Sequence, residues 1–273
     1  MITISVKTST ENNVLIGENI LTDCGKYISE VKKPCKAAII SDDMVYSLYG
    51  ETVKNSLKAY GYEVCSYAFE NGEKSKNLAG AFHQPILVVC DTKTFDTLDP
   101  KQISCGMAEV IKYGIICDRE LFDILETKAP DYTELSARCI GIKRDIVERD
   151  EFEHGDRKLL NLGHTLGHAV EKHSNFELTH GAAVAVGMMM ICSIAEQKGY
   201  AKENMTERLK NVLVKYGLPT SYSISADELF DIATGDKKVS GGNITAVIPE
   251  SIGKCLLEKM SLEDFRELIN LAF

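Results

Sequence analysis

The 273-residue chain lacks an excess of basic residues. It carries 31 Lys and Arg against 40 Asp and Glu, which gives a net charge of −9 and a pI of about 5.3. A protein that follows a nucleic-acid backbone needs a basic surface stripe. The composition therefore argues against nucleic acid as the main partner, although a local basic pocket for a small anion is compatible with it.

The chain also lacks the apolar segments that membrane insertion and export require. Its longest apolar stretch, residues 182–195, is too short to span a bilayer. Met1 leads directly into ITISV, without the charged and apolar regions of a signal peptide. The nine cysteines are scattered with no C-x2-C pair, a pattern typical of reduced, buried thiols in the cytosol. We therefore expect a cytoplasmic protein with no membrane partner.

A glycine-rich phosphate loop is missing as well. The first hundred residues alternate between short apolar strands and helices, which predicts an α/β domain with parallel strands. Ligands bind at the carboxyl ends of such strands, and Asp42 follows one of them. The expected strands lie at residues 2–6, 14–16, 36–41, 62–69 and 86–90, with helices at 19–31 and 43–60. This is too little sheet for a doubly wound domain.

From Ser104 onward the sequence predicts mainly helix. The expected helices lie at residues 105–116, 119–126, 132–148, 158–173, 181–198, 203–216, 226–233 and 262–271, with two short strands at 243–249 and 254–260. If the helix at 158–173 is continuous, Asn161, His164 and His168 lie on one of its faces. The boundary between the two domains falls near Pro100. We therefore predict an α/β domain over residues 1–100 and a helical domain over residues 101–273.

Five of the six histidines lie between residues 148 and 180. His164 and His168 are one helical turn apart, and His180 follows His164 at a distance that fits two helices joined by a turn. Catalytic zinc takes three ligands from His and Glu or Asp, and Glu109 is a lone acid on an apolar helix face. A single histidine is more often a satisfied core or capping residue. Five clustered histidines favour a metal site.

Basic residues in partly apolar surroundings are candidates for anion binding. They are Lys112, Lys143, Arg144, Arg157, Lys237 and Lys238. Lys112 lies three residues after Glu109 on one helix face, so an ion pair within the helix is the alternative. Lys143 and Arg144 could equally lie on a solvated face, and Lys237 in a surface turn.

Four motifs of the chain have a specific order and spacing. They are Gly106-Met107-Ala108-Glu109-Val110-Ile111-Lys112-Tyr113-Gly114, the run from Glu153 through Arg157, Asn161 and His164 to His168-Ala169, the pair His180-Gly181, and Asp236-Lys237-Lys238. Together they closely resemble the 3-dehydroquinate synthase family. The agreement extends along nearly the whole chain after Asn77, and residues 71–76 fit the family's first segment.

This resemblance implies an enzyme of the shikimate route to aromatic amino acids. The family converts 3-deoxy-D-arabino-heptulosonate 7-phosphate into 3-dehydroquinate and phosphate. It binds NAD on a Rossmann-like α/β domain and zinc or cobalt between that domain and a helical one. The resemblance also suggests a homodimer. NAD+ oxidises a substrate hydroxyl, phosphate is eliminated, the ketone is reduced again, and the opened ring closes in an aldol step.

Carried over by position, the resemblance also implies roles for individual residues. The metal ligands would be Glu109, His164 and His180. The substrate carboxylate would meet Lys143 and Arg157, since fixed cations suit an anionic substrate. The phosphate would be faced by Asn161, His168 and Lys237, and the reacting hydroxyls would be positioned by Lys112. The cofactor side would comprise Asp42, Glu73, Lys76 and Asn77, the last of which would also face the phosphate.

Between Lys76 and Leu78 the chain departs from the family pattern. Members of the family continue here through a glycine-rich NAD loop, a Thr-Thr pair and an Asp-Ser-Ser-x-Gly-Gly-Lys motif. An internal deletion would remove central βα elements, the pyrophosphate loop, and an Asp and a Lys of the active site. Loss of interior strands would also expose apolar edges and faces. We therefore expect weak NAD binding and little or no turnover.

Three other interpretations stay open at this point. A related sugar-phosphate cyclase, such as 2-deoxy-scyllo-inosose synthase, would share the metal site but leave Arg157 and Lys143 without a substrate carboxylate. A non-catalytic remnant would bind metal in its helical domain without releasing phosphate. A glycerol-dehydrogenase-like oxidoreductase shares the broad architecture, but it does not explain the Lys, Arg and Asn residues.

Overall fold

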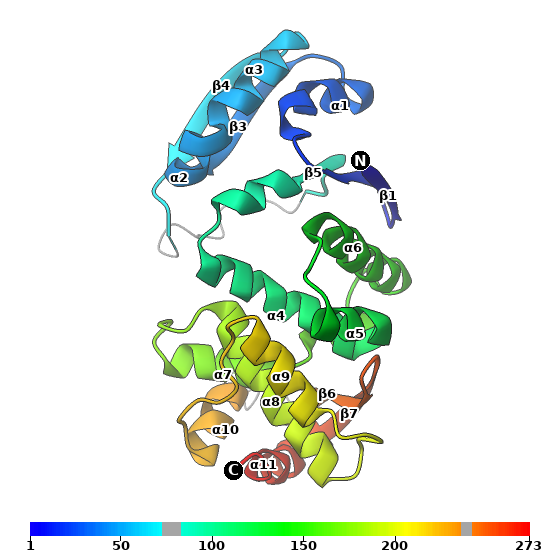
Figure 1. The fold of residues 1–273 in the computed structure, drawn as a ribbon, viewed down its shortest axis with the longest axis vertical. Helices are drawn as coiled ribbons and strands as arrows, with labels where there is room; N and C mark the ends of the chain where they lie inside the picture. Colours follow the sequence, from blue (N-terminus) through cyan, green and yellow to red (C-terminus); the bar gives the residue numbers. More distant parts are fainter. Residues whose placement is uncertain (73–82, 236–241) are drawn as a thin grey trace. The chain divides into compact units, whose positions relative to one another are not determined.

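The computed structural model describes residues 1–72, 83–235 and 242–273 (Figure 1). The chain divides into two compact units. The first comprises residues 1–96 and 132–140, and the second comprises residues 97–131 and 141–273. An α/β region followed by a helical region confirms the fold class predicted from the sequence. Within the described residues, no helix is long and apolar enough to cross a membrane.

The first unit contains a three-stranded sheet in the order β1-β2-β5. Strand β1 (Ile2–Lys7) pairs antiparallel with β2 (Glu11–Gly17), which pairs parallel with β5 (Leu87–Asp91). Ile4, Val14 and Ile16 form its buried core. The half-buried side chains that pack against this core include Ala137 and Ile140 of helix α6 (Tyr132–Arg149). Burial of this apolar surface is what holds the small sheet together.

A second, two-stranded parallel sheet is formed by β3 (Lys36–Asp42) and β4 (Glu63–Phe69). The connection between them runs through α2 (Asp43–Val45), a π-helical turn η2 (Tyr46–Gly50) and α3 (Glu51–Ala59). A 3-10 turn η1 (Leu21–Asp23) and α1 (Cys24–Val31) precede β3. The sequence predicted one parallel sheet. In the described residues, however, β2 pairs with β5 and not with β3, so the strands form two separate sheets.

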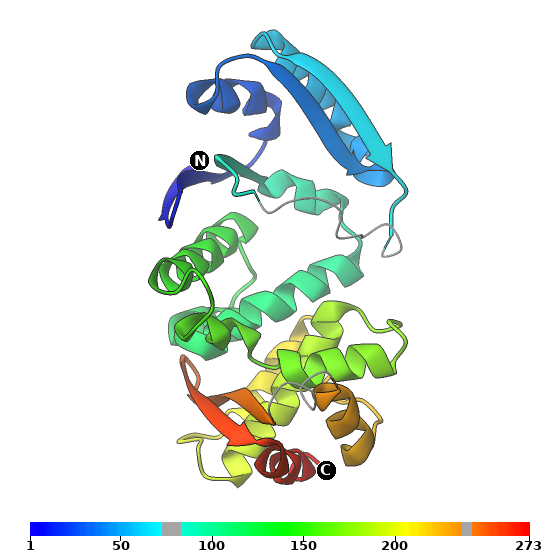
Figure 2. The same cartoon turned by 180° about the vertical axis from the view of Figure 1, so that it is seen from behind.

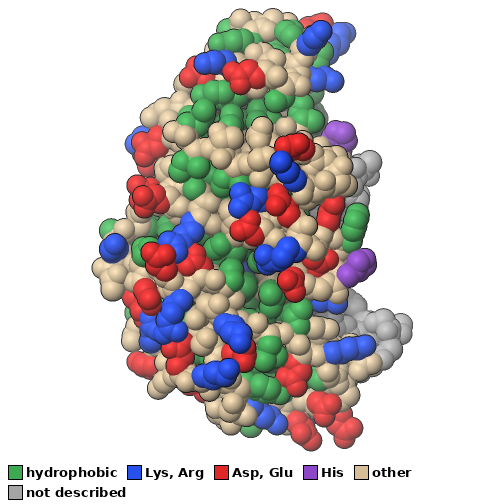
Figure 3. All heavy atoms as spheres, turned by 90° about the vertical axis from the view of Figure 1, so that its right-hand side faces the viewer, with side chains coloured by type: hydrophobic (Ala, Val, Ile, Leu, Met, Phe, Trp, Pro, Cys, Tyr) green, Lys and Arg blue, Asp and Glu red, His purple; other side chains and the backbone are tan. Residues whose placement is uncertain are grey.

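One face of the β3–β4 sheet carries apolar side chains that no other described element covers. Ile40 pairs with Tyr67 across the sheet, and these residues are 70% and 67% exposed. Phe69 continues the row on β4. Helix α3 lies on the opposite face, so Figure 2 looks onto the uncovered strands, and Figure 3 shows apolar side chains at the surface of this unit. An exposed apolar strand face of this kind promotes association.

The second unit is built around α8 (His180–Gln197), of which eleven of 18 residues are buried. Helices α4 (Pro100–Cys117) and α7 (His164–His173) pack against α8. The remaining elements are η4 (Thr92–Thr97, shared with the first unit), α5 (Arg119–Thr127), η5 (Asp156–Asn161), α9 (Thr206–Lys215), α10 (Ala226–Thr234), the hairpin β6 (Asn243–Ser251) and β7 (Lys254–Ser261), and α11 (Leu262–Asn270).

Two glycines allow α8 to approach its neighbours backbone to backbone. A Cβ atom at Gly187 would lie 2.1 Å from the carbonyl oxygen of Gly163, and one at Gly181 would lie 2.4 Å from the carbonyl oxygen of Cys105. Real Cβ atoms do not approach that closely, so only glycine fits at either position. These contacts bring α4, the start of α7 and the start of α8 together.

The predicted helix at residues 158–173 is interrupted in the structure. Residues 156–161 form the 3-10 turn η5, and α7 begins only at His164. Between them, Gly163 has φ of +72°, a left-handed conformation that an α-helix does not contain. The sequence pattern predicted Asn161 on the same α-helical face as His164. The break between η5 and α7 shows that the two residues do not share an α-helix.

The substitution Gly187→Ala should destabilise the helical unit. Its methyl group would force α8 away from Gly163, and overpacking of this kind costs about 3 kcal/mol. Urea unfolding monitored by circular dichroism measures the change. Gly141→Ala is the matched control, because a Cβ at this helical position meets nothing within 4 Å and should stabilise the protein by roughly 0.5–1 kcal/mol. Equal stability of Gly187→Ala and the unaltered chain would contradict the close contact.

The uncovered β3–β4 face should respond to polar substitution. Ile40→Thr combined with Tyr67→Thr removes exposed apolar surface, so we expect weaker binding of the dye ANS and less self-association. Stability should change by no more than about 0.5 kcal/mol, since neither side chain is packed. Val214→Thr on α9, at a residue that is 61% exposed, is the control and should leave dye binding unchanged. Undiminished dye binding by the double variant would show that ANS binds to another apolar surface.

Candidate metal centre and adjoining pocket

Helix α4 presents a buried ion pair at the centre of the site. The Nζ atom of Lys112 donates to Oε2 of Glu109 at 2.5 Å, and Lys112 is only 3% exposed. The ion pair that the sequence offered as the alternative for Lys112 is thus present. Burial, with the repulsion of nearby Lys143, lowers the pKa of Lys112, although Glu109 opposes this. Burial raises the pKa of Glu109, but the charges of Lys112 and the neighbouring histidines outweigh it and leave the pKa below its usual value.

The second carboxylate oxygen of Glu109 faces two imidazoles. Its Oε1 lies 3.6 Å from Nε2 of His164 and 3.8 Å from Nε2 of His180, the first residues of α7 and α8. This oxygen is buried, and no hydrogen-bond donor for it exists among the described residues. Burial, then the charge of Lys112, lowers the pKa of His164 to about 4, so its ring is neutral at pH 7. A carboxylate oxygen and neutral imidazole nitrogens form a donor set for a divalent cation.

His168 adds a third imidazole to this group. One ring nitrogen from each of His164, His168 and His180 lies within 4.8 Å of the others. The ring centroids of His164 and His168 are 5.3 Å apart, one turn along α7. The spacing of two histidines in the sequence therefore does produce neighbouring rings. Because the nitrogen and oxygen donors suit zinc or cobalt, the residues present fit such an ion.

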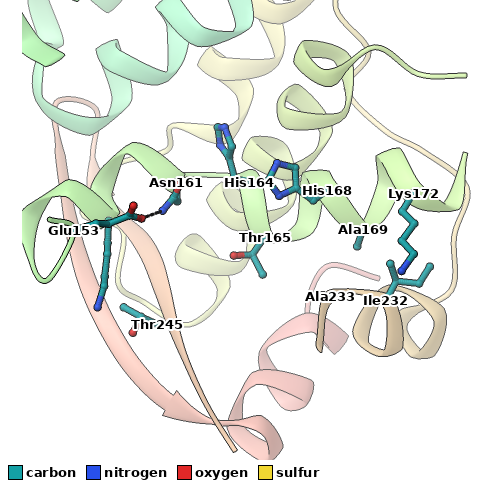
Figure 4. A pocket seen from close by; sticks show the side chains of 11 residues that line it. Glu153, Asn161, His164, Thr165, His168, Ala169, Lys172, Ile232, Ala233 and Thr245 are labelled. Carbon is teal, nitrogen blue, oxygen red and sulfur yellow. Dashed lines mark hydrogen bonds between the residues drawn. The ribbon is translucent and has the colours of Figure 1, made fainter. Parts of the chain in front are cut away.

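A cavity of about 520 Å³ adjoins the metal-ligating candidates. It is lined by Glu153, Lys158, Asn161, His164, Thr165, His168, Ala169, Lys172, Ile232, Ala233 and Thr245. Figure 4 shows the rings of His164 and His168 on one side of α7, with Thr165 on the other. Asn161 donates from Nδ2 to Oε1 of Glu153 at 3.0 Å. Lysine ammonium groups and imidazoles on the wall make this a suitable pocket for an anionic ligand.

The loop before η5 is organised by one carboxylate. Asp150 accepts hydrogen bonds from the backbone N–H groups of His154, Gly155 and Arg157 at 2.9, 2.7 and 3.0 Å. Desolvation would raise the pKa of Asp150, but these donors lower it below its usual value. The guanidinium of Arg157 donates to the carbonyl oxygen of Glu151 and does not line the cavity. The loop thus fixes the backbone from which Arg157 extends.

The remaining described sequence candidates do not line this cavity. Lys143 lies exposed on α6, and Asp42 caps α2 in the first unit by accepting from the N–H of Val45 at 2.8 Å. Five candidates lie outside the described residues: Glu73, Lys76, Asn77, Lys237 and Lys238.

Sequence reasoning overlooked several residues of the site. Glu153, Lys158 and Lys172 line the cavity, and Glu171 contacts a ring of the metal-ligating candidates. Glu153 was already part of a recognised motif, and Lys172 lies one helical turn after His168. The motif that contains Glu153 and the spacing of Lys172 from His168 were visible in the sequence. Neither feature distinguished these two residues from ordinary solvated positions.

Comparison with known proteins identifies the family. Residues 106–239 match the family described as 3-dehydroquinate synthase C-terminal. The 3-dehydroquinate synthase of Clostridium acetobutylicum is 32% identical over an alignment that covers 92% of this chain and 94% of that protein. This chain belongs to the 3-dehydroquinate synthase family. That alignment runs over 336 positions and the chain has 273 residues, so at least 63 positions have no residue here. The 3-dehydroquinate synthase of Clostridium beijerinckii is 41% identical over 71% of this chain and 57% of that protein.

Solved structures of sugar-phosphate cyclases share the fold of this family member. The 2-epi-5-epi-valiolone synthase ValA of Streptomyces hygroscopicus, which has NAD+ and Zn2+ bound, superposes with a TM-score of 0.83 at 18% identity over 98% of this chain and 97% of that chain. A 2-deoxy-scyllo-inosose synthase complexed with carbaglucose-6-phosphate, NAD+ and Co2+ gives 0.82 at 19% identity over 98% and 99%. At these identities the likeness establishes the fold alone.

Replacement of Glu109 should abolish tight metal binding. Glu109→Ala removes the oxygen that faces His164 and His180, and we expect the affinity for Co2+ to fall by roughly 100-fold or more, since even outer-shell partners are worth 10–100-fold. Calorimetric titration of the metal-free protein measures the change. Glu177→Ala, at an exposed position between α7 and α8, should bind Co2+ like the unaltered protein. Equal affinities for both variants would rule out Glu109 as a ligand.

Proposed function

We propose that this chain is a 3-dehydroquinate synthase whose turnover is impaired by an internal deletion. The intact reaction converts 3-deoxy-D-arabino-heptulosonate 7-phosphate into 3-dehydroquinate and phosphate in aromatic amino acid biosynthesis. The observation that carries the proposal is the orphaned Glu109 oxygen, which lies opposite two imidazole nitrogens in a member of this family. NAD and zinc or cobalt are the proposed cofactors, since Zn2+ or Co2+ accompanies NAD+ in the cyclase structures that share the fold.

Glu109, His164 and His180 would hold the metal, which supplies Lewis acidity toward a substrate oxygen. Lys112 keeps Glu109 ionised and turned toward the two histidines through its contact with Oε2. Ala108 and Ile111, which flank Glu109 on α4, are fully buried, so packing fixes the backbone from which the carboxylate of Glu109 extends. The metal-ligating candidates are thus placed before any ligand arrives, which is what orientation of a substrate oxygen requires.

The anionic ends of the substrate would meet separate groups of residues. We assign the carboxylate to Lys143 and Arg157, and the phosphate to Asn161, His168 and Lys237, with Asn77. Asn161 and His168 line the same cavity, which supports their shared role. The NAD contacts of the proposal are Asp42, Glu73, Lys76 and Asn77. Asp42 stands at the carboxyl end of β3, the edge at which α/β sheets bind ligands.

The proposed impairment rests on the first unit. The relatives carry at least 63 aligned positions that this chain lacks, and the two described sheets are small and separate. The bare apolar face formed by Ile40, Tyr67 and Phe69 is what removal of neighbouring elements would leave. A cytoplasmic location and a homodimer belong to the same proposal, and the nine free cysteines suit a reducing compartment.

The proposal can be tested by restoring the missing positions. A chimera would carry the corresponding segment of the Clostridium acetobutylicum relative at the join between Lys76 and Leu78. Released inorganic phosphate would be measured with 3-deoxy-D-arabino-heptulosonate 7-phosphate, NAD and Co2+, and NAD binding by titration. The unaltered chain should release little or none. The chimera should bind NAD and release phosphate, and His180→Ala within it should lower the rate roughly 100-fold or more.

Each other result has a defined meaning. Saturable NAD binding and turnover by the unaltered chain would contradict the impairment. A chimera that binds NAD and Co2+ but releases no phosphate would contradict the synthase assignment. In that case a related sugar-phosphate cyclase or a non-catalytic metal-binding remnant is the better description, and the phosphorylated substrate of 2-deoxy-scyllo-inosose synthase would distinguish them.

A further inference from the structure

His180 makes a second contact on the side of its ring that faces away from Glu109. Its Nδ1 lies 3.3 Å from Oε2 of Glu171, a residue of α7 whose side chain is only 19% exposed. Its Nε2 meanwhile faces Glu109 at 3.8 Å. Because the two ring nitrogens have different partners, Glu171 acts on the imidazole from behind and is not positioned to be a ligand itself.

His164 has an equivalent contact of a different kind. Its Nδ1 lies 3.1 Å from the carbonyl oxygen of Leu162. A carbonyl oxygen only accepts hydrogen bonds, so this contact places the proton of His164 on Nδ1 and the lone pair on Nε2. The Oε2 atom of Glu171 has the same effect on His180 when it accepts a hydrogen bond from Nδ1. Both rings are therefore held with the lone pairs of Nε2 toward the orphaned oxygen of Glu109.

The two rings differ in how firmly the protein packs them. The side chain of His164 is 14% exposed, whereas that of His180 is 42% exposed. His180 is the first residue of α8 and follows the capping residue Thr179, so little protein surrounds its ring. Packing can fix the orientation of His164, but a ring that is nearly half exposed needs a hydrogen bond to hold it.

We propose that Glu171 is the positioning residue of the metal centre, which fixes the tautomer and orientation of His180. The inference rests on the proposed function only in that the centre binds a divalent metal. Carboxylate partners behind metal-ligating imidazoles recur in metalloproteins, where their loss lowers metal affinity by 10–100-fold. Glu171 lies on the same helix as His164 and His168, so α7 supplies both a ligand and the support for a ligand from α8.

The test is Co2+ binding by the metal-free full chain, measured by calorimetry and by the visible absorption of the bound ion. Glu171→Ala should weaken binding by roughly 10–100-fold and alter the absorption band. Glu171→Gln keeps an oxygen that can accept from Nδ1, so it should restore most of the affinity and the original band. Glu177→Ala, at an exposed position three residues before His180, should match the unaltered chain in both readouts.

Two outcomes would overturn the proposal. One is unaltered Co2+ affinity and absorption in Glu171→Ala. The other is an equal loss in Glu171→Ala and Glu171→Gln together with reduced thermal stability of both metal-free proteins, which would make Glu171 a purely structural residue. Neither outcome depends on turnover. The Glu171 variants could therefore show the expected Co2+ binding while the restored chimera releases no phosphate. That combination would contradict the synthase function but support the role of Glu171.

Discussion

The contact between the backbones of α8 and its two neighbours sets the geometry of the metal centre. The three proposed ligands come from the middle of α4 and the first residues of α7 and α8, so their separation follows from the distance between helix axes. Metal–ligand bonds tolerate errors of only about 0.2 Å. A single methyl group at Gly187 or Gly181 would displace a helix by more than that, because its ideal position already overlaps a carbonyl oxygen. The glycines are therefore part of the site, although they contact no ligand.

The charges in the site depend on one another in the same way. A buried carboxylate is unfavourable unless both oxygens are satisfied, and Lys112 satisfies only Oε2 of Glu109. The cost of the remaining oxygen is about 1–3 kcal/mol, and a bound cation removes it. Burial, then the charge of Lys112, lowers the pKa of His164 to about 4, so the residue that keeps the carboxylate ionised also helps to leave the imidazole lone pair available. One lysine thus influences the charge state of two proposed ligands.

The sequence predicted the helices and the histidine cluster well and the connections poorly. Helices α4 and α8 and the rings of His164 and His168 follow from apolar periodicity and a spacing of four residues. The helix break at Gly163 could not be predicted, because a glycine that interrupts a helix cannot be distinguished in the sequence from one that lets helices approach, such as Gly167. Asn161 nevertheless lines the same cavity as His164 and His168, from a 3-10 turn in place of an α-helix.

The pairing of the strands could not be predicted from the sequence either. Each strand was recognisable from its own residues, but the pairing of β2 with β5 joins segments about seventy residues apart, and local patterns do not encode such pairings. The cysteines were expected to be buried on the evidence of their apolar neighbours. Cys35, Cys65 and Cys117 are exposed. Cys65 lies on the face of the β3–β4 sheet that no described residue covers, Cys35 precedes β3, and Cys117 is the last residue of α4. Burial depends on the whole fold, and the apolar sequence neighbours of a cysteine do not determine it.

The two units therefore give different information about activity. All proposed metal ligands, and Glu171 behind one of them, belong to helices α4, α7 and α8 of the second unit, whereas the β3–β4 sheet belongs to the first. Metal binding by this chain is consequently necessary for the proposed reaction but carries no information about the cofactor. In the proposed reaction NAD would bind at the carboxyl ends of strands, and the described strands of the first unit form two small, separate sheets. An intact metal centre in this chain is compatible with a complete loss of turnover, so only a measurement that depends on NAD can distinguish a working synthase from a metal-binding remnant.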